Sequence, residues 1–265
     1  MNAEMYGLEG KVAIVTGAGS GIGQGVAREM VRVGGKVVVA DIDGEAAEQS
    51  AARLKELGGE AEAVHADVTD EGSVGSMLGA AIDAFGGVDI LVNNVGGLGG
   101  KPRMTPIVDM GLEQWEAVIR LNLTSQFLCS RACIRYWVDK GRRGNIVNVS
   151  SLAAMVPYET SVAYGAAKAG VVNLTSTLAA QYGKHGIRVN CIAPGHVRTP
   201  VTDELYRGRE DVRAAQDRII PVGRYGEPEE LGRVAVFLAS DASSYVTGQT
   251  LLVSGGMYYF LTRLP

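Results

Sequence analysis

The chain has 265 residues, of which 46% are hydrophobic, enough apolar material for the core of one α/β domain without a linker. A net charge of −4 excludes the strongly basic surface that is typical of nucleic-acid-binding proteins. No apolar run approaches the roughly 18 residues of a membrane span, and the start, MNAEMYGLEG, lacks the regions of a signal peptide. We therefore expect a cytoplasmic protein of one domain, residues 1–265, with no nucleic-acid or membrane partner.

Short β-branched runs alternate with longer helical patterns along the chain. The runs are continuously apolar, which indicates strands buried on both faces, and the helices between them supply the crossovers of a parallel sheet. The sequence predicts an α/β, doubly wound fold with a seven-stranded parallel sheet. The expected strands are 11–17, 36–41, 61–68, 89–96, 144–151, 187–195 and 250–256.

The first strand leads into a glycine-rich turn, TGAGSGIGQG, at residues 16–25. The common spacing G-x-G-x-x-G is not met, because Ile22 stands where the last glycine should be. Gly17, Gly21 and Gly23 still allow backbone N–H groups and a helix N-terminus to approach a pyrophosphate. The turn therefore predicts a dinucleotide site in a Rossmann fold, although glycines can also serve a tight turn alone.

The second strand ends at Asp41, in the sequence VVVADID. An acid at this point of a dinucleotide-binding fold accepts hydrogen bonds from the adenosine ribose diol, which favours NAD. A 2′-phosphate would be repelled there, and neither Ser20 nor Ile42 supplies a compensating positive charge. The alternative is a surface acid in a DID segment that caps the next helix.

The cysteines, Cys129, Cys133 and Cys191, are too few and too scattered for a disulfide framework or a zinc site. The chain has only three histidines, and they are not clustered. We assign no metal and expect the cysteines to be small buried side chains.

Tyr164 and Lys168 lie four residues apart in a predicted helix, so a phenol and an ammonium share one face. A free tyrosine has a pKa of about 10 and is a poor base at neutral pH. A cation beside the ring favours the phenolate, so the pKa of this tyrosine should fall toward the working range.

The segment after the sixth predicted strand, about 196–220, is rich in charged and turn residues. We expect it to form a lid of short helices over the strand ends.

Six motifs occur in order along nearly the whole chain. They are TGxxxGxG at 16–23, NNVG at 93–96, Asn122 in RLNL, Ser151 in NVSS, YxxxK at 164–168 and PGHVRT at 194–199. Together they resemble the short-chain dehydrogenase/reductase family. YxxxK alone is a weak signal, but the ordered set is highly specific.

The resemblance implies catalytic roles for four residues. Tyr164 would exchange the proton with the substrate oxygen, and Ser151 would hydrogen-bond that oxygen. Lys168 would bind the nicotinamide ribose, and Asn122 would hold a water that links Lys168 to solvent. Taken singly, Ser151 is also compatible with a turn, Asn122 with a helix-interior position and Lys168 with a solvated helix face.

The resemblance also implies a set of residues that bind NAD. Asp67 and Val68 would contact the adenine, although Asp67 is also compatible with an N-cap, and the segment from Pro194 would hold the carboxamide. The full set is Gly17, Ser20, Gly21, Ile22, Gly23, Asp41, Ile42, Asp67, Val68, Asn94, Gly96, Tyr164, Lys168, Pro194, Gly195, Val197 and Thr199.

The sequence departs from the family pattern at two positions. Val95 stands for the alanine of NNAG and adds bulk beside the cofactor, and Ser254 stands for the aspartate before the terminal glycine pair. The second change puts the details of subunit contacts in doubt. The pattern at 113–137 and the helix of Tyr164 nevertheless resemble the helices of the family's dimer-of-dimers interface, which implies a homotetramer.

The residues expected to face the substrate are mostly apolar, which favours a secondary alcohol or ketone of modest polarity. They are Leu98, Met104, Val156, Pro157, Tyr158, His196, Val201, Leu205 and Tyr206. His196 is more typical of a pocket wall than of a catalytic group.

The leading interpretation is an NAD-dependent alcohol dehydrogenase, and the alternative is a 3-oxoacyl-acyl-carrier-protein reductase. The alternative needs a basic docking patch, for which Arg207, Arg209 and Arg213 are candidates, but Glu210 and Asp211 interrupt them. A nucleotide-sensing regulator without catalysis would not require the set of Asn122, Ser151, Tyr164 and Lys168.

Overall fold

A central sheet of seven parallel strands organises the computed structural model, which describes residues 6–100, 105–157, 162–205 and 207–258. The strand order is β3-β2-β1-β4-β5-β6-β7, so the chain winds outward in both directions from the boundary between β1 and β4. This confirms the predicted doubly wound fold. The strands are β1 Val12–Thr16, β2 Lys36–Asp41, β3 Ala61–His65, β4 Ile90–Asn93, β5 Gly144–Val149, β6 Ile187–Pro194 and β7 Thr250–Val253.

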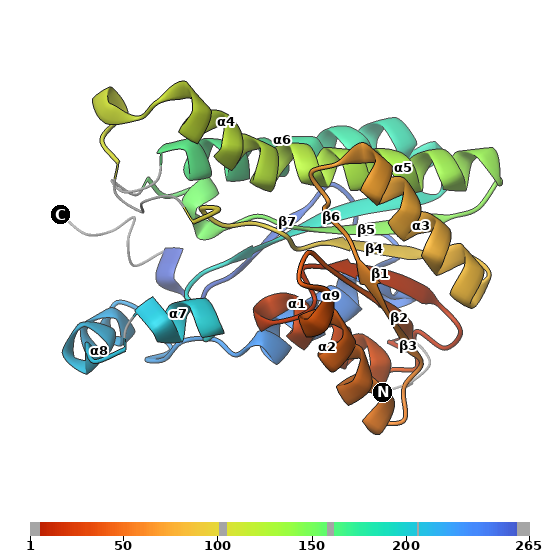
Figure 1. Cartoon of the computed structure of the whole chain (residues 1–265), viewed down its shortest axis with the longest axis horizontal. Helices are drawn as coiled ribbons and strands as arrows, with labels where there is room; N and C mark the ends of the chain where they lie inside the picture. Colours follow the sequence, from red (N-terminus) through yellow and green to blue (C-terminus); the bar gives the residue numbers. More distant parts are fainter. Residues whose placement is uncertain (1–5, 101–104, 158–161, 206, 259–265) are drawn as a thin grey trace.

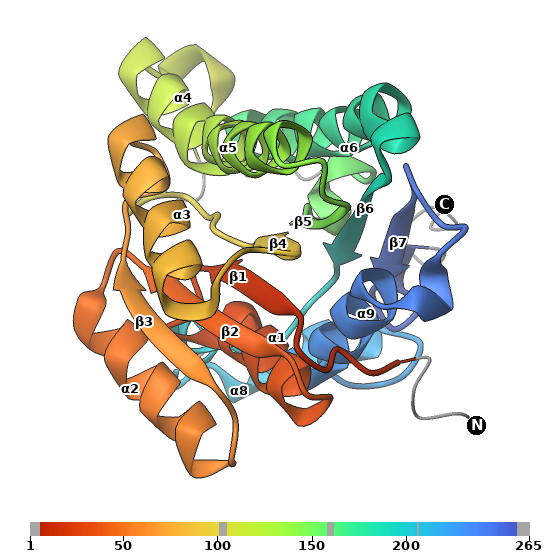
Figure 2. The same ribbon diagram turned by 90° about the vertical axis from the view of Figure 1, so that its right-hand side faces the viewer.

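Helices cover both faces of the sheet (Figures 1 and 2). One face packs against α1 Gly21–Arg32, α2 Gly44–Glu56 and α9 Pro228–Ala239, and the other against α3 Glu71–Phe85, α5 Ser125–Asp139 and α6 Val162–Tyr182. The short helices α4 Leu112–Ile119, α7 Pro200–Leu205 and α8 Glu210–Arg218 lie toward the carboxyl ends of the strands. Within the described residues, no helix is long and apolar enough to cross a membrane.

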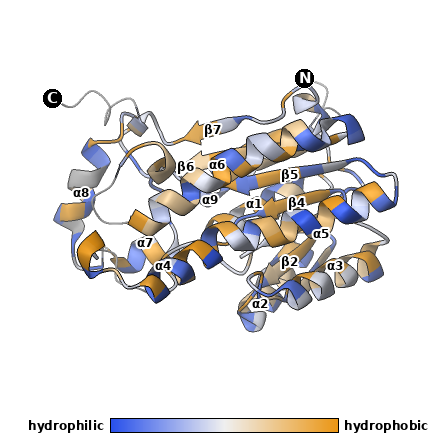
Figure 3. Ribbon diagram, turned by 90° about the horizontal axis from the view of Figure 1, so that it is seen from above, coloured by the Kyte–Doolittle hydropathy of each residue, from blue (hydrophilic) through white to orange (hydrophobic). Residues whose placement is uncertain are grey.

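The continuous apolar runs follow from this two-sided burial. In β1, Ala13 and Val15 belong to the core beneath α1 and α9, whereas Ile14 between them belongs to the core beneath α3 and α5. Successive side chains of a strand point to opposite faces, so a strand covered on both sides is apolar at most positions. In Figure 3 the hydrophobic colour is clear on β4, whereas β5, which carries the buried Asn145 and Asn148, is partly hydrophilic, and the outer helices alternate between the two colours.

Several strands are shorter at their carboxyl ends than the sequence predicts. The third ends at His65 rather than 68, the fourth at Asn93 rather than 96, and the seventh at Val253 rather than 256. After two of these strands a backbone N–H group donates to a side chain instead of to a neighbouring strand. Asn94 N–H donates to Thr16 Oγ1 at 3.0 Å, and Asp67 N–H donates to Ser73 Oγ at 2.9 Å. The residues that follow the shortened third and fourth strands line the cleft described next.

Candidate active site

Two connected cavities lie at the carboxyl ends of the strands. The first is a cleft of about 470 Å³ between the turns that follow β1, β2 and β4, and the second, of about 700 Å³, lies beneath α7. Ser151 and Tyr164 line both cavities. Ligands in this fold bind at the carboxyl edge of the sheet, so two ligands in these cavities would meet at Ser151 and Tyr164.

The glycine turn after β1 forms one wall of the cleft. Gly17 and Gly21 have φ angles of 63° and 56°, which side chains rarely adopt. A Cβ atom on Gly23 would lie 2.2 Å from the carbonyl oxygen of Gly17, so only glycine allows this close approach of α1. Ser20 occupies the N-cap position of α1 but makes no capping hydrogen bond with its side chain. The N–H groups of the first turn therefore face a cleft that suits a phosphate.

Asp41 lies at the end of β2, beside this turn. Its Oδ2 accepts a hydrogen bond from Gly19 N–H at 2.9 Å, and its Oδ1 accepts one from Asp43 N–H at 3.0 Å. The helix-capping role belongs to Asp43, whose side chain accepts from Ala46 N–H. Each oxygen of Asp41 keeps a second lone pair, so the carboxylate is held in place at the wall of the cleft and can still accept from a ligand.

Asp67 and Val68 line the cleft beyond Asp41, as does Ile42. The Oδ1 atom of Asp67 accepts hydrogen bonds from the backbone and the hydroxyl of Thr69, at 2.8 and 2.7 Å. The N-cap of α3 is Asp70, so the capping alternative for Asp67 is wrong.

Lys168 is a buried lysine, only 2% exposed, which rules out the solvated-face alternative. Its Nζ donates to the carbonyl of Val149 at 2.9 Å and lies 5.7 Å from the ring centroid of Tyr164. Burial lowers the pKa of Lys168 to about 8, because the charged ammonium loses its hydration. Most of the lysine therefore stays protonated at neutral pH, with the charge next to the phenol.

Asn122 lies in a π-helical turn, Arg120–Thr124, between α4 and α5. Its amide accepts from Gly97 N–H at 2.9 Å and donates to the carbonyls of Gly97 and Val118 at 2.7 and 2.8 Å. A Cβ atom on Gly96 would lie 2.7 Å from both Asn122 Oδ1 and Lys168 Nζ. Asn122 therefore fixes the loop after β4 beside Lys168, and the water that it is expected to hold stays a prediction.

Ser151 follows β5 and begins a short 3₁₀ turn, Leu152–Ala154. Its hydroxyl oxygen accepts from Ala153 N–H at 3.2 Å, which makes it a turn serine as well as a lining residue. The hydroxyl hydrogen remains able to donate to a ligand. The neighbouring Ser150 binds the carbonyl of Lys168 at 2.7 Å and so ties β5 to α6.

The expected residues after β6 also reach the cavities. Pro194, Gly195 and Thr199 line both of them, and Val197 lines the second. Asn94 lines the cleft, and its side chain donates to the carbonyls of Thr16 and Gly17.

The two departures from the family pattern have visible contacts. A side chain at Gly17 would meet Val95 Cγ2 at 3.1 Å, so Val95 packs directly against the glycine turn. A side chain at Gly195 would meet the Cβ atom of Ser254 at 2.8 Å. Ser254 therefore supports the segment after β6 from behind.

The structure divides the residues that the sequence assigned to the substrate. Leu98, His196 and Val201 line the second cavity, whereas Val156, Pro157 and Leu205 are not among its described lining residues. Met104, Tyr158 and Tyr206 lie outside the described residues. The cavity is also lined by four residues that the sequence did not predict, Leu121, Leu152, Ala153 and Thr202. Proximity to Asn122, Ser151 and Thr199 in the chain was the available signal for them.

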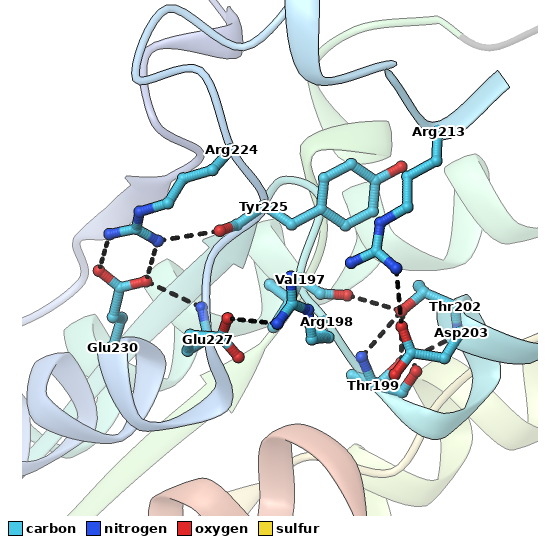
Figure 4. A network of polar contacts seen from close by, with 10 residues as sticks. All are labelled: Val197, Arg198, Thr199, Thr202, Asp203, Arg213, Arg224, Tyr225, Glu227 and Glu230. Atoms are coloured by element: carbon cyan, nitrogen blue, oxygen red, sulfur yellow. Dashed lines mark hydrogen bonds and ion pairs between the residues drawn. The ribbon is translucent and has the colours of Figure 1, made fainter. Parts of the chain in front are cut away.

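The segment above the second cavity is fastened at both ends (Figure 4). Arg198 N–H donates to the carbonyl of Gly226 at 2.8 Å, and Gly226 N–H donates to the carbonyl of His196 at 3.0 Å. An ion pair of 3.3 Å joins Arg198 to Glu227 at the start of α9. The chain between these points carries α7 and α8, so both helices are anchored at one place, where residues 196–198 bind residues 226–227. We call this place the base of the segment.

Contacts within this segment connect its two helices. Arg213 of α8 lies 3.4 Å from Asp203 of α7, and its guanidinium lies 5.6 Å from the ring centroid of Tyr225. The ring of Tyr225 also packs against His196, with ring centroids 5.1 Å apart. His196 is thus a packed wall of the cavity, as the sequence analysis expected.

Metal-binding side chains do not gather at this site. Among the described residues, no group of three or more His, Cys, Asp or Glu could hold a metal ion. The three cysteines are all buried.

Comparison with known proteins gives consistent matches over almost the whole chain. Residues 17–258 match a family model described as Enoyl-(Acyl carrier protein) reductase. The chain is 43% identical over 251 residues to 3beta-hydroxysteroid dehydrogenase 1 of Eggerthella lenta, covering 94% of each chain.

Two solved structures share the fold and over a third of the sequence. A 7 alpha-hydroxysteroid dehydrogenase complexed with NADH and 7-oxo glycochenodeoxycholic acid is 35% identical, with a TM-score of 0.90 and 97% coverage of both chains. A putative 2-deoxy-d-gluconate 3-dehydrogenase from Agrobacterium tumefaciens, with bound NADP, is 35% identical, with a TM-score of 0.87 and coverage of 96% of this chain and 99% of the other.

Proposed function

The chain belongs to the short-chain dehydrogenase/reductase family and is an oxidoreductase of that type, and we propose that it transfers a hydride between NAD and a secondary alcohol or ketone of modest polarity. The observation that carries this proposal is the position of Ser151 and Tyr164, which line both cavities, with the ammonium of Lys168 beside the tyrosine ring. A cofactor in the cleft and an alcohol in the second cavity would meet at these two hydroxyl groups.

The residues that line the cleft fit a dinucleotide. Gly17, Gly21 and Gly23 leave room for a pyrophosphate that a side chain would fill. Asp41 would accept from the ribose hydroxyls, while Ile42 and Val68 would flank the adenine. When bound, the cofactor supplies the nicotinamide carbon that accepts or gives the hydride.

The chain's own residues would handle the proton. Tyr164 would take it from the alcohol during oxidation and return it during reduction, while Ser151 would donate a hydrogen bond to the same oxygen. The ammonium of Lys168 favours the phenolate form of Tyr164 and would also bind the ribose. Asn122 holds the loop at Gly97 and thereby keeps one wall of the site in place.

Charge supports NAD over NADP. The carboxylate of Asp41 would lie near the 2′ position of a bound cofactor, and the described residues that line the cleft include a single cationic side chain, Lys168. A pair of like unit charges 4 Å apart costs about 4 kcal/mol at an effective dielectric constant near 20, before screening. A 2′-phosphate would meet this repulsion without a compensating cation.

A second candidate is a 3-oxoacyl-acyl-carrier-protein reductase, because the description of the matching family model names an acyl carrier protein, although it names reduction of an enoyl rather than a 3-oxoacyl group. This function needs a basic docking patch, and two of the arginines that could form one are already paired: Arg207 with Glu204 and Arg213 with Asp203. Two of the three arginines are therefore neutralised within the lid segment.

We also propose that the protein assembles as a homotetramer. A groove of about 400 Å³ follows α5 and α6, and it combines apolar side chains, Phe127, Ile134, Val138 and Leu178, with charged ones, Arg131, Arg135 and Asp139. Phe127 and Val138 are 42% and 39% exposed, which indicates a face for another copy of the chain. Light scattering tests this, and Phe127→Glu should dissociate the assembly.

Steady-state kinetics with NAD and NADP test the proposed function. We expect kcat/KM to be at least about tenfold higher with NAD, since repulsion at Asp41 opposes the extra phosphate. The double change Asp41→Ala and Ile42→Arg should narrow or invert this ratio, because it removes the carboxylate and adds a phosphate-binding fork. An NADP preference in the unchanged enzyme, together with turnover of a 3-oxoacyl thioester, would instead favour the second candidate.

A further inference from the structure

We propose that the substrate is a bulky, mainly apolar ring alcohol rather than a small polyol, and that Val201 of α7 is a side chain that selects it. This inference rests on the proposed function, because it concerns the molecule whose hydroxyl would meet Ser151 and Tyr164. It adds the size and surface chemistry of that molecule.

The first argument is size. The second cavity has a volume of about 700 Å³ and extends past Tyr164 toward Leu98 and His196. Pockets of about 300 to 1,000 Å³ bury most of the surface of a drug-sized molecule. A fused-ring alcohol fills such a space, whereas a six-carbon polyol leaves much of it to water.

The second argument is the chemistry of the wall. Apart from Ser151 and Tyr164, the polar side chains that line the cavity are His196, Thr199 and Thr202, and the other side chains are apolar: Ile22, Leu98, Leu121, Leu152, Ala153, Val197 and Val201, with Pro194. The hydroxyl of Thr202 accepts from Thr199 N–H at 2.8 Å and contacts the carbonyl of Val197 at 3.0 Å, so it is engaged by its own segment. A polyol would bury several hydroxyl groups against this wall without partners, which is unfavourable.

The third argument is the exposure of Val201. This side chain is 78% exposed although it lines both cavities. When an apolar ligand covers a branched apolar side chain at the mouth of a cavity, both lose contact with water, and this contributes favourable binding free energy. Leu98 reaches the same cavity from the loop after β4, on another element. An apolar ring held between the two segments would bring α7 down onto the ligand.

The chain offers a matched control in Val222. It is also an exposed valine, 61% accessible, and it is not among the described residues that line either cavity. Changing it alters the same kind of surface without touching the site.

Oxidation rates with NAD should be measured for neutral monohydroxy steroids substituted at different ring positions, for cyclohexanol and for sorbitol. We expect at least one steroid to exceed sorbitol in kcat/KM by about 100-fold or more, because the polyol leaves its hydroxyls unpaired. Val201→Ser should lower the steroid-to-cyclohexanol ratio of kcat/KM by about tenfold, while Val222→Ser should change it by less than about twofold.

Calorimetric binding of the corresponding neutral steroid ketones gives a second readout that does not depend on the position of the reacting carbon. Tighter binding to the unchanged protein than to Val201→Ser supports the inference even where turnover is slow. A preference for sorbitol, or equal ketone binding by the two proteins, overturns it. The proposed function fails separately, if none of the alcohols is oxidised although a ring ketone binds.

Discussion

The cofactor cleft and the substrate cavity share Ser151 and Tyr164, but they are built in different ways. The cleft is walled by turns that leave the sheet directly after β1, β2 and β4, and close backbone approach shapes it, as at Gly17 and Gly23. The substrate cavity is also walled by turns, those that follow β4, β5 and β6, but one of its sides is formed by α7. The turns are placed by the sheet itself, whereas the position of α7 depends on contacts such as the pair of Arg198 and Glu227.

The largest expected effect lies where the two regions meet. Tyr164→Phe keeps the ring and removes the hydroxyl, so the fold and NAD affinity should be retained. Turnover should fall by roughly 10² or more, the usual contribution of a positioned acid or base. Single-turnover kinetics and NAD titration of the variant measure both quantities. A variant that keeps a tenth of the activity would show that the proton takes another route.

A change at Gly23 breaks the cleft alone. Gly23→Ala places a Cβ atom 2.2 Å from the Gly17 carbonyl, and the overpacking should cost about 1 to 3 kcal/mol of stability and weaken NAD binding by at least about tenfold. Gly75→Ala is the control, because Gly75 is also a helical glycine and has no atom within 4 Å of its Cβ position.

The control should stabilise the protein by about 0.5 to 1 kcal/mol, since alanine restricts the unfolded chain and favours helix. Urea denaturation and calorimetric titration with NAD compare the two variants. If Gly23→Ala bound NAD as the unchanged protein does, the close approach of α1 would not be needed for the cofactor.

The difference between the regions also explains how much could be predicted from the sequence. The apolar runs of the strands and the glycine spacing are local signals, so the doubly wound parallel sheet and the place of Asp41 at the end of β2 could be predicted from them. The fixed base of the lid segment did not, because Arg198 and Glu227 are far apart in the chain and nothing local pairs them. Leu121 and Leu152 are next to predicted site residues in the chain, but the packing of the elements that carry them decides that they line the cavity.

Lys168, beneath the shared hydroxyls, should give the protein a measurable pH dependence. Its pKa is lowered by burial from 10.5 to about 8, so between these values the unfolded chain binds more protons than the native state. Native stability should therefore rise with pH in this window, by up to about 1.4 kcal/mol per pH unit.

The comparison should be made with Lys168→Met between pH 8 and 9. Cys129 and Cys191 have pKa values raised by burial, to about 12 and about 11, and they lower stability above pH 9 in both proteins. The difference between the two proteins isolates the lysine. A constant difference across pH 8 to 9 in urea denaturation would mean that the lysine titrates as it does in water.

The smallest expected effect is at the base of the lid segment. Glu230 accepts from both terminal nitrogens of Arg224 at 2.8 Å and from Glu227 N–H at 2.8 Å, which completes the capping box of α9 (Figure 4). These bonds, with that of Arg224 first, lower the pKa of Glu230 from 4.5 to about 2. Its contribution is therefore complete above pH 4.5 and is lost as the pH falls toward 2.

Glu230→Gln should cost about 1 kcal/mol at pH 7, the usual loss of a helix cap, because solvent screens the partly exposed ion pair. Glu229→Gln is the control, since Glu229 also lies in the first turn of α9 and pairs with the partly exposed Arg28 at 3.1 Å, and it should cost less than about half as much. Urea denaturation at pH 7 and pH 4 measures both. The cost of Glu230→Gln should shrink at pH 4, because protonation of the unfolded chain already removes part of what the carboxylate contributes. Equal costs for the two variants at both pH values would mean that the capping box does not hold the base of the lid, and that α7 depends on its contacts with the cavity instead.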